Sequence, residues 1–413
     1  MKRLPFFQLL TLSLWGLSLQ ASAAYYDTLP AGVRLLAMRQ VTTSNISSSY
    51  AKSNNESPYA IEQNITFSSL KNLNSFTQTT YEQLHAISPA AAEQLELGEY
   101  KADAKAKVNV NGFGLAYGIT NYITAYGSIP YYDASTDISF TRTRGNNYNQ
   151  VKKLVSSGQQ TDFQNIYNNM LGQLPDANGP LLQSLLVNRY GYQPLGLWQG
   201  KGYGDAEFGM MMRLTDFKDR GLALSFGGVA PTGKLENPDI LQDISFGDGQ
   251  WDVFAEFGGG FEMNRRWLVL NSWARYTYQM PYSRVLRAPD DKEFTLTDKK
   301  QDFKIKLGDK FDYVLSPTWI MTDWLTFKTE YIFNYQMKSV YSSSNVLANE
   351  ILATNTESMA QHARIATNVS STKLYLMKKF MLPASIEFSA QTMFMGQNTP
   401  KYSRYDIELR FYF

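Results

Sequence analysis

The chain ends with the stretch SRYDIELRFYF, residues 403–413, in which apolar or aromatic side chains alternate with mainly charged ones from Arg404 onward. A repeat of two places successive side chains on opposite faces of a β-strand, so one face of this strand is apolar and the other is charged. A strand of a soluble sandwich can show the same alternation. The distinguishing feature is that the alternation continues to an aromatic residue at the C-terminus, Phe413.

The other end of the chain indicates secretion. Lys2 and Arg3 precede an apolar stretch at 4–19, and small residues follow at 21–23. We therefore predict a signal peptide over residues 1–23. A secreted chain whose last strand ends in an aromatic residue resembles bacterial outer-membrane β-barrels. The resemblance implies a location in the outer membrane of a Gram-negative bacterium, contact with its lipid, and recognition of the Phe413 strand by the barrel assembly machinery.

The composition excludes several other classes of protein. The 413 residues include no Cys, which excludes a disulfide scaffold and thiol chemistry. Removing the signal peptide takes Lys2 and Arg3 from the 39 basic residues and leaves 37, equal to the 37 acidic ones, so no net charge attracts nucleic acid. Beyond the signal peptide, no apolar run reaches the ~18–20 residues of a membrane-spanning helix. Strands are then the remaining way to cross a membrane.

The two-residue repeat recurs along the whole mature chain. For example, Val253, Ala255 and Phe257 alternate with Asp252 and Glu256. Each such run reaches the ~9–11 residues that a tilted membrane strand needs. These runs predict twelve strands, near 32–44, 100–118, 121–134, 204–216, 220–233, 250–263, 266–281, 302–316, 323–338, 361–377, 382–396 and 402–413.

The predicted connections differ in length in a regular way. Tight turns are expected at 118–121, 216–221, 264–265, 317–322 and 378–381. Long loops are expected at 45–99, 135–203, 234–249, 282–301 and 339–360. Short periplasmic turns and long extracellular loops are typical of transmembrane barrels. We therefore predict an all-β fold: one transmembrane, antiparallel, up-and-down barrel over residues 24–413, with about twelve strands (10–14) and helical insertions in its long extracellular loops.

Charged side chains on the strands of such a barrel are expected in the lumen, because the outer face meets lipid. The predicted lumen-lining residues are Lys101, Asp103, Lys105, Lys107, Glu207, Arg213, Glu256, Arg275, Lys304, Lys306, Lys310, Lys328, Glu330, Glu387, Arg404, Glu408 and Arg410. Basic residues concentrate at 100–118 and 302–316, so an open pore is expected to favour anions. The charges could equally pair and fill the lumen, as side chains often do in small barrels.

Helices are expected in the two longest loops. Thr161 and Gln164 have the spacing of a capping box that opens a helix, and a second helix is expected from Pro180. The apolar face expected of these helices consists of Phe163, Ile166, Tyr167, Met170, Leu171, Leu182, Leu185 and Leu186. Ser88 followed by Pro89 predicts a further helix start in the 45–99 loop. These faces either pack on one another as a cap or form an apolar capture site over the barrel mouth.

Several strand ends and turns carry a further resemblance. The segments YGDAEFG at 203–209, PTGK at 231–234, GDGQWD at 247–252 and TDWL at 322–325 are similar to an outer-membrane channel family associated with the meta-cleavage pathway of phenol degradation. The likeness is strongest over 203–283, and the helical insertion at 145–200 departs from the compact loops of that family. The resemblance implies a barrel and a transport role.

No catalytic site is visible in the sequence. His85 and His362 are the two histidines, and neither has a recognisable nucleophile or orienting partner, so both are interpreted as surface polar residues. We expect no enzyme activity, no metal site and no cofactor. The sequence predicts a channel for passive or gated passage of small molecules, with hydrophobic or aromatic compounds as candidates and the solute itself unidentified. The alternative is a non-conducting structural or adhesin-type surface barrel with a plugged lumen.

Overall fold

A computed structural model describes residues 24–71, 75–173, 183, 185–215, 217, 220–263, 267–292 and 295–413. The predicted signal peptide and Leu182 lie outside this part of the chain. Within the described residues, none of the helices is both long enough and apolar enough to pass through a membrane.

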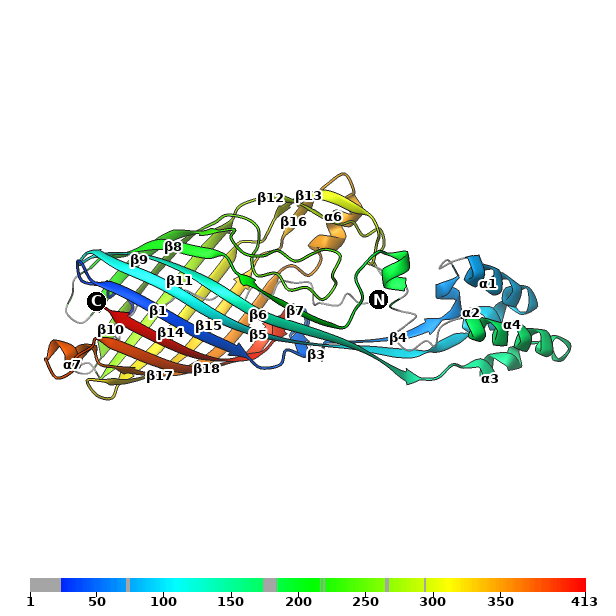
Figure 1. The fold of residues 1–413 in the computed structure, drawn as a ribbon, viewed down its shortest axis with the longest axis horizontal. Coiled ribbons are helices and arrows are strands. Elements are labelled where there is room, and N and C mark those ends of the chain that lie inside the picture. The colour runs from blue at the N-terminus through cyan, green and yellow to red at the C-terminus, as the bar shows by residue number, and fades with distance from the viewer. Residues whose placement is uncertain are drawn as a thin grey trace.

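The main sheet closes on itself as an antiparallel barrel (Figure 1). Its twelve strands are β1 (Arg34–Thr43), β5 (Glu96–Thr120), β6 (Ile123–Arg144), β8 (Ala206–Arg213), β9 (Arg220–Ala230), β10 (Asp252–Met263), β11 (Leu268–Gln279), β14 (Lys310–Ile320), β15 (Leu325–Gln336), β17 (Ser358–Ser370), β18 (Ala384–Gln397) and β20 (Ser403–Tyr412). The first strand pairs with the last, and β5 pairs with both β1 and β6, so the sheet has no open edge in the wall. The predicted all-β barrel of about twelve strands is confirmed.

The two ends of the barrel differ, and we call them the turn end and the loop end. The turn end carries the short connections, including the one that holds α7 (Thr372–Leu376), and Arg34 there exchanges backbone hydrogen bonds with Phe413. The loop end carries the long connections. Along each wall strand, side chains alternate between the lumen and an outer face with exposed apolar groups such as Leu115, Phe257 and Phe388. The same alternation of apolar and charged residues is present in the sequence of the last strand, residues 403–413.

One predicted strand is interrupted. The sequence predicts a single strand at 302–316, but the structure has β13 (Lys300–Lys306) and then β14, which begins at Lys310. At Gly308 between them, a Cβ would overlap the carbonyl oxygen of Met337, so the close approach of the backbone requires glycine there. β13 lies outside the wall and pairs with β12 (Tyr282–Arg287) and β16 (Val340–Ser342) in a separate small sheet at the loop end, beside α6 (Val346–Ala353).

The strands β5 and β6 continue well beyond the barrel as a two-stranded arm. They contain 25 and 22 residues and are widened by β4 (Ala60–Thr66) and β7 (Leu197–Tyr203). A second small sheet, β2 (Ser48–Tyr50), β3 (Glu56–Pro58) and β19 (Thr399–Lys401), lies near the start of the arm. Figure 1 shows a group of helices at the far tip of the arm, well away from the barrel.

We call these helices the helical head. It consists of the helices α1 (Ser75–Ile87), α2 (Pro89–Gln94), α3 (Tyr148–Val151) and α4 (Gln160–Gln173) and the 3-10 turns η2 (Phe67–Leu70), η3 (Lys152–Leu154) and η4 (Ser157–Gln159). The head has its own apolar core, in which Leu84, Leu95, Phe163 and Met170 are fully buried. Ser88 caps α2 as predicted, by accepting a hydrogen bond from the backbone N–H of Ala91. The helix α4 begins at Gln160, before the predicted capping residue.

We expect Phe163→Ala to loosen the head without opening the barrel. Removing a fully buried aromatic ring costs about 3–5 kcal/mol of local stability, whereas the wall depends on separate interactions. Limited proteolysis should then cut the variant within α4, while unheated protein keeps the electrophoretic mobility of a folded barrel. Asn165→Ala, which changes an exposed side chain in the same helix, is the control. Equal protease resistance in both variants would contradict an independent core in the head.

Candidate functional site: the barrel lumen

The lumen of the barrel contains a cavity of about 220 Å³. Its lining runs from Tyr25 and Trp273 near the turn end to Gln336 and Thr399 near the loop end. Most of the lining side chains are polar or charged, and they come from strands on both sides of the barrel. The cavity is therefore a polar space inside the wall and is the candidate functional site.

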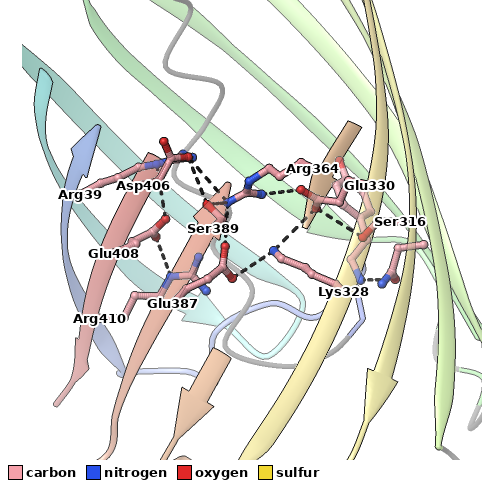
Figure 2. A network of polar contacts seen from close by, with 12 residues as sticks. Arg39, Ser316, Lys328, Glu330, Arg364, Glu387, Ser389, Asp406, Glu408 and Arg410 are labelled. Atoms are coloured by element: carbon pink, nitrogen blue, oxygen red, sulfur yellow. Dashed lines mark hydrogen bonds and ion pairs between the residues drawn. The ribbon is translucent and has the colours of Figure 1, made fainter. Parts of the chain in front are cut away.

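A network of ion pairs lines one side of the lumen, on β1, β15, β17, β18 and β20 (Figure 2). Arg364 lies at its centre and donates hydrogen bonds to Glu330, to Glu387 at 2.8 Å and to the Ser389 hydroxyl at 2.9 Å. Lys328 adds an ion pair with Glu387 at 3.0 Å. Because these groups are buried, mutual pairing is what makes their charges tolerable inside the barrel.

Strand register explains why this network forms. Glu330 lies directly opposite Arg364 on the neighbouring strand, and Arg39 lies opposite Glu408. Inward-facing positions two residues apart then stack along the barrel axis, which brings Arg39 to Asp406 at 2.5 Å. Cross-strand neighbours of opposite charge stabilise a sheet, so the register of five strands and the network support each other.

A second charged cluster lies on the opposite side, on β8, β10, β11 and β14. Arg275 forms a two-pronged contact with Glu207, with N–O distances of 3.2 and 2.8 Å, and its guanidinium lies 3.6 Å from the centre of the Phe254 ring. Lys310 pairs with Asp248 at 2.9 Å. Planar pairing of Arg with a carboxylate is the strongest common ion-pair geometry, so this side of the lumen is firmly fixed.

The first residues that the structure describes, from Ala24 onward, enter the lumen at the turn end. The backbone N–H of Tyr25 donates to the Asn271 side chain at 2.8 Å, and the Tyr25 hydroxyl donates to Glu256. The Tyr25 ring stacks on Trp273, and Arg213 lies over the ring of Tyr26. We call residues 24–33 the N-terminal plug. The plug was not predicted from the sequence; the two adjacent tyrosines, Tyr25 and Tyr26, just beyond the predicted cleavage site are the signal that could have indicated it.

An apolar cluster covers part of the inner face at the loop end. In this cluster, inward-facing residues of β1, β5 and β6 pack against residues from two of the long connections. The cluster includes Val41, Val108, Tyr132, Leu186, Tyr192, Leu195, Leu241, Ile244 and Phe246. The first connection contains η5 (Leu185–Arg189), and the second joins β9 to β10. Tyr132 stacks on Phe246 with 5.1 Å between ring centres. We call this cluster the loop cap.

Arg287 on β12, outside the wall, links the two connections of the loop cap by hydrogen bonds. It donates hydrogen bonds to the backbone carbonyls of Tyr190, Gly191 and Thr297 and to the carboxylate of Asp239. Burial raises the pKa of Asp239, but hydrogen bonds from Lys300 and Arg287 outweigh it and hold that pKa below the ordinary range. Asp239 therefore stays ionised at neutral pH, and the two connections remain joined.

The structure places the predicted lumen-lining residues in three groups. Those that line the cavity or take part in the networks and plug around it are Glu207, Arg213, Glu256, Arg275, Lys310, Lys328, Glu330, Glu387, Arg404, Glu408 and Arg410. Lys101, Asp103, Lys105 and Lys107 instead share the outward parity of exposed Leu115, while the alternate residues Ala104 and Ala106 are buried. Lys304 and Lys306 lie on β13, outside the wall. Of the six basic residues predicted in the lumen from 100–118 and 302–316, Lys310 lines the cavity and the other five lie outside it, so these two segments do not concentrate basic charge in the lumen.

Several lumen residues were missed. Arg39, Asp312, Arg364 and Asp406 are buried at inward-facing positions, in strands that were predicted near these residues but whose charges at these positions were not assigned to the lumen. His362 also lines the cavity and is 2 % exposed, which corrects its interpretation as a surface residue. Within the described part of the chain, no cluster of His, Asp and Glu has the arrangement of a metal site.

The predicted apolar face of the loop helices is divided between two places. Phe163, Tyr167 and Met170 are buried in the helical head, with Ile166 packed against them. Leu186 belongs to the loop cap. For Leu171 and Leu185 only the backbone is described, and Leu182 lies outside the described residues. The head and the loop cap are separate clusters, so these residues do not form one surface over the barrel mouth.

Comparison with known proteins supports the architecture. The sequence matches no protein-family model and none of the curated proteins. Among solved structures, an outer-membrane channel from Pseudomonas putida F1 superposes with a TM-score of 0.54 at 11% identity, over 94% of this chain and 98% of that one. The two chains share their fold.

Two other solved structures are more distant. The monoaromatic hydrocarbon channel CymD has a TM-score of 0.32 at 10% identity and covers 93% of this chain and 88% of its own. The toluene transporter TbuX of Ralstonia pickettii has a TM-score of 0.33 at 9% sequence identity, and the match covers 93% of this chain and 90% of that one. The resemblance to the phenol-degradation channels stays a prediction.

We expect Arg364→Met to destabilise the barrel by about 3–5 kcal/mol, because it leaves Glu330 and Glu387 buried with less compensating charge. The control is Lys373→Met, which removes an ion pair with Asp323 whose side chains are 56% and 50% exposed. An exposed pair of this kind contributes less than about 1 kcal/mol. Denaturant unfolding in detergent, followed by tryptophan fluorescence, measures both. Similar losses in the two variants would contradict a structural role for the network.

Proposed function

We propose that the chain is an outer-membrane channel for small molecules, and that its passage is gated. The observation that carries this is the polar lumen cavity, which is lined at the turn end by Tyr25 of the N-terminal plug, a segment outside the wall ladder. The loop cap packs against the inner face of the wall at the other end of the barrel. A barrel built only for structure has no need of a polar cavity beside such a plug. The fold shared with the Pseudomonas putida channel supports the same role.

The N-terminal plug is suited to act as the gate. Residues 24–31 make no strand pairing with the wall and are attached by individual contacts, such as Leu29 N–H to the Thr124 hydroxyl at 2.8 Å and Ala31 N–H to the Asn121 side chain at 2.9 Å. Gly32 and Val33 exchange backbone hydrogen bonds with Gly118 of β5 and anchor the plug to the wall. Segments outside a ladder can shift while the ladder stays intact. Movement of the plug would join the cavity to the turn end without opening the wall.

The orientation follows from the connections. The turn end faces the periplasm and the loop end faces the outside, as the short-turn and long-loop rule requires. Exposed apolar side chains on the outer face, among them Phe226, Phe257, Ile365 and Ile407, then contact outer-membrane lipid. The last strand closes the barrel, and Phe413 after it exchanges backbone hydrogen bonds with Arg34. We propose that the barrel assembly machinery recognises this C-terminal segment.

The lumen favours small solutes that carry a charge or a polar group. A purely apolar compound would displace water from buried Arg, Lys and Glu side chains without replacing its hydrogen bonds, which is costly. The aromatic side chains Tyr25, Tyr126 and Trp273 at one end of the cavity and Tyr402 at the other still offer contacts to a ring. Aromatic compounds with a polar substituent therefore fit this lumen better than hydrocarbons.

The alternative is a non-conducting surface barrel. Its supporting observation is the helical head, which the arm holds far from the lumen (Figure 1). Deleting the head separates the two functions, because solute passage should persist in a channel whose path lies within the wall. If the protein serves surface attachment, the deletion should abolish surface binding, and conductance should be absent throughout.

We expect Tyr25→Ala to increase ion flow through the barrel. The change removes the hydrogen bond to Glu256 and the stacking on Trp273, which together hold the plug in place. Single-channel recording in planar bilayers should show a higher conductance or open probability than in the wild type.

Tyr375→Ala, at an exposed tyrosine of α7 on the same end of the barrel, is the matched control and should behave like the wild type. No conductance in the wild type or in either variant would favour the structural barrel. Equal conductance in all three would leave a channel but reject the plug as its gate.

A further inference from the structure

Arg404, near the loop end of β20, has few partners for a buried guanidinium. It is 5 % exposed and lines the cavity. Among the described residues, its closest acidic contact is Asp406, at 3.3 Å, and its Nε atom has no hydrogen-bond partner. A guanidinium has five N–H donors, and burying them unpaired is expensive. Arg404 is therefore short of acceptors at the edge of a cavity.

Its surroundings concentrate positive charge. Asp406 is shared by three guanidinium groups: those of Arg39 at 2.5 Å, Arg404 at 3.3 Å and Arg364 at 3.9 Å. Arg39 has a second acidic contact at Glu408, and Arg364 has two others, at Glu330 and Glu387. Within the described network, the one acidic partner of Arg404 is Asp406, which also pairs with Arg39 and Arg364. The positive charge that is not neutralised therefore lies near Arg404.

Neighbouring inward-facing residues supply both polar and apolar contacts. Strand register places Gln391 directly opposite Arg404, and the row next to it contains His362, Met393 and Tyr402. The rings of His362 and Tyr402 are 5.8 Å apart, and Met393 is 2 % exposed. The Nδ1 atom of His362 is buried without a partner among the described residues. The cavity wall here combines a cation, side-chain hydrogen-bonding groups and a thioether–aromatic surface.

We propose that this part of the lumen is a binding site for a small aromatic carboxylate, with Arg404 as its anion-recognising residue. A carboxylate matches the planar donor fork of Arg and relieves its shortage of acceptors. The ring of the ligand packs against Tyr402 and Met393, which are suited to aromatic contact. A cavity of about 220 Å³ is smaller than the 300–1,000 Å³ typical of sites for drug-sized ligands, so the ligand is a single-ring compound.

This inference names the solute class for the proposed channel and rests on that function for its biological role. The binding itself is tested separately from transport. Benzoate is titrated into the purified full-length barrel in detergent by isothermal titration calorimetry. Benzamide is the neutral analogue of the same shape, and acetate is the carboxylate without a ring. Benzoate should bind, whereas benzamide should bind at least roughly tenfold more weakly, because it lacks the charge that Arg404 recognises.

Variants assign the binding to the site. Arg404→Gln should weaken benzoate binding at least roughly tenfold. Arg404→Lys, which keeps the charge but loses the planar fork, should retain part of the affinity. Lys401→Gln removes a positive charge three residues earlier on the loop-end β19, where Lys401 pairs with Glu56 outside the cavity, and should bind like the wild type. Folding of every variant is checked by the mobility of unheated protein on a gel.

The outcomes separate the two proposals. Benzoate binding that is lost in Arg404→Gln while bilayers show no conductance supports the site and rejects the channel. Conductance without benzoate binding supports the channel and overturns the site. Acetate binding as strong as benzoate binding overturns the aromatic part of the proposal. Equal benzoate affinity in wild type and folded Arg404→Gln overturns the assignment to Arg404.

Discussion

The structure depends on closing the sheet between its first and last strands. Backbone N–H and C=O groups in contact with lipid must be paired within the protein, and only a closed ladder achieves this for strands. Pairing of β1 with β20, and of β5 with both β1 and β6, removes the free edges from the wall. Closure also fixes which face of each strand is inside, so Arg39, Arg364 and Asp406 must share a narrow lumen and satisfy one another there.

The enclosed charges then determine what the lumen can do. Paired groups such as Arg275 and Glu207 hold the strands in register, and they also line the polar cavity next to the N-terminal plug. In the proposed channel, the side chains that stabilise the barrel also line the path of the solute. A cation with an incomplete set of acceptors, as at Arg404, is costly to the fold but available to a ligand.

Much of the fold could be predicted because strand alternation is a local property of the sequence. The last strand shows its apolar and charged faces in residues 403–413 without reference to any other segment. The same reasoning failed for Lys101, Lys105 and Lys107, because it assumed that charged residues on a barrel strand point inward. With 25 residues, β5 extends over roughly 80 Å, far beyond the ~25 Å apolar band of an outer-membrane barrel. Its outer face can be charged where it lies in water. The N-terminal plug and the centre of the ion network depend on contacts between distant segments, such as Tyr25 with Glu256, which no local pattern encodes.

Permeability of liposomes that contain the purified wild-type barrel tests the central claim most directly. A gated channel predicts that such liposomes swell faster than protein-free liposomes in a panel that runs from sugars to aromatic acids, with the fastest swelling for small charged or polar solutes. Swelling no faster than that of protein-free liposomes for every solute in the panel, with the barrel shown to be folded and inserted, would contradict the account.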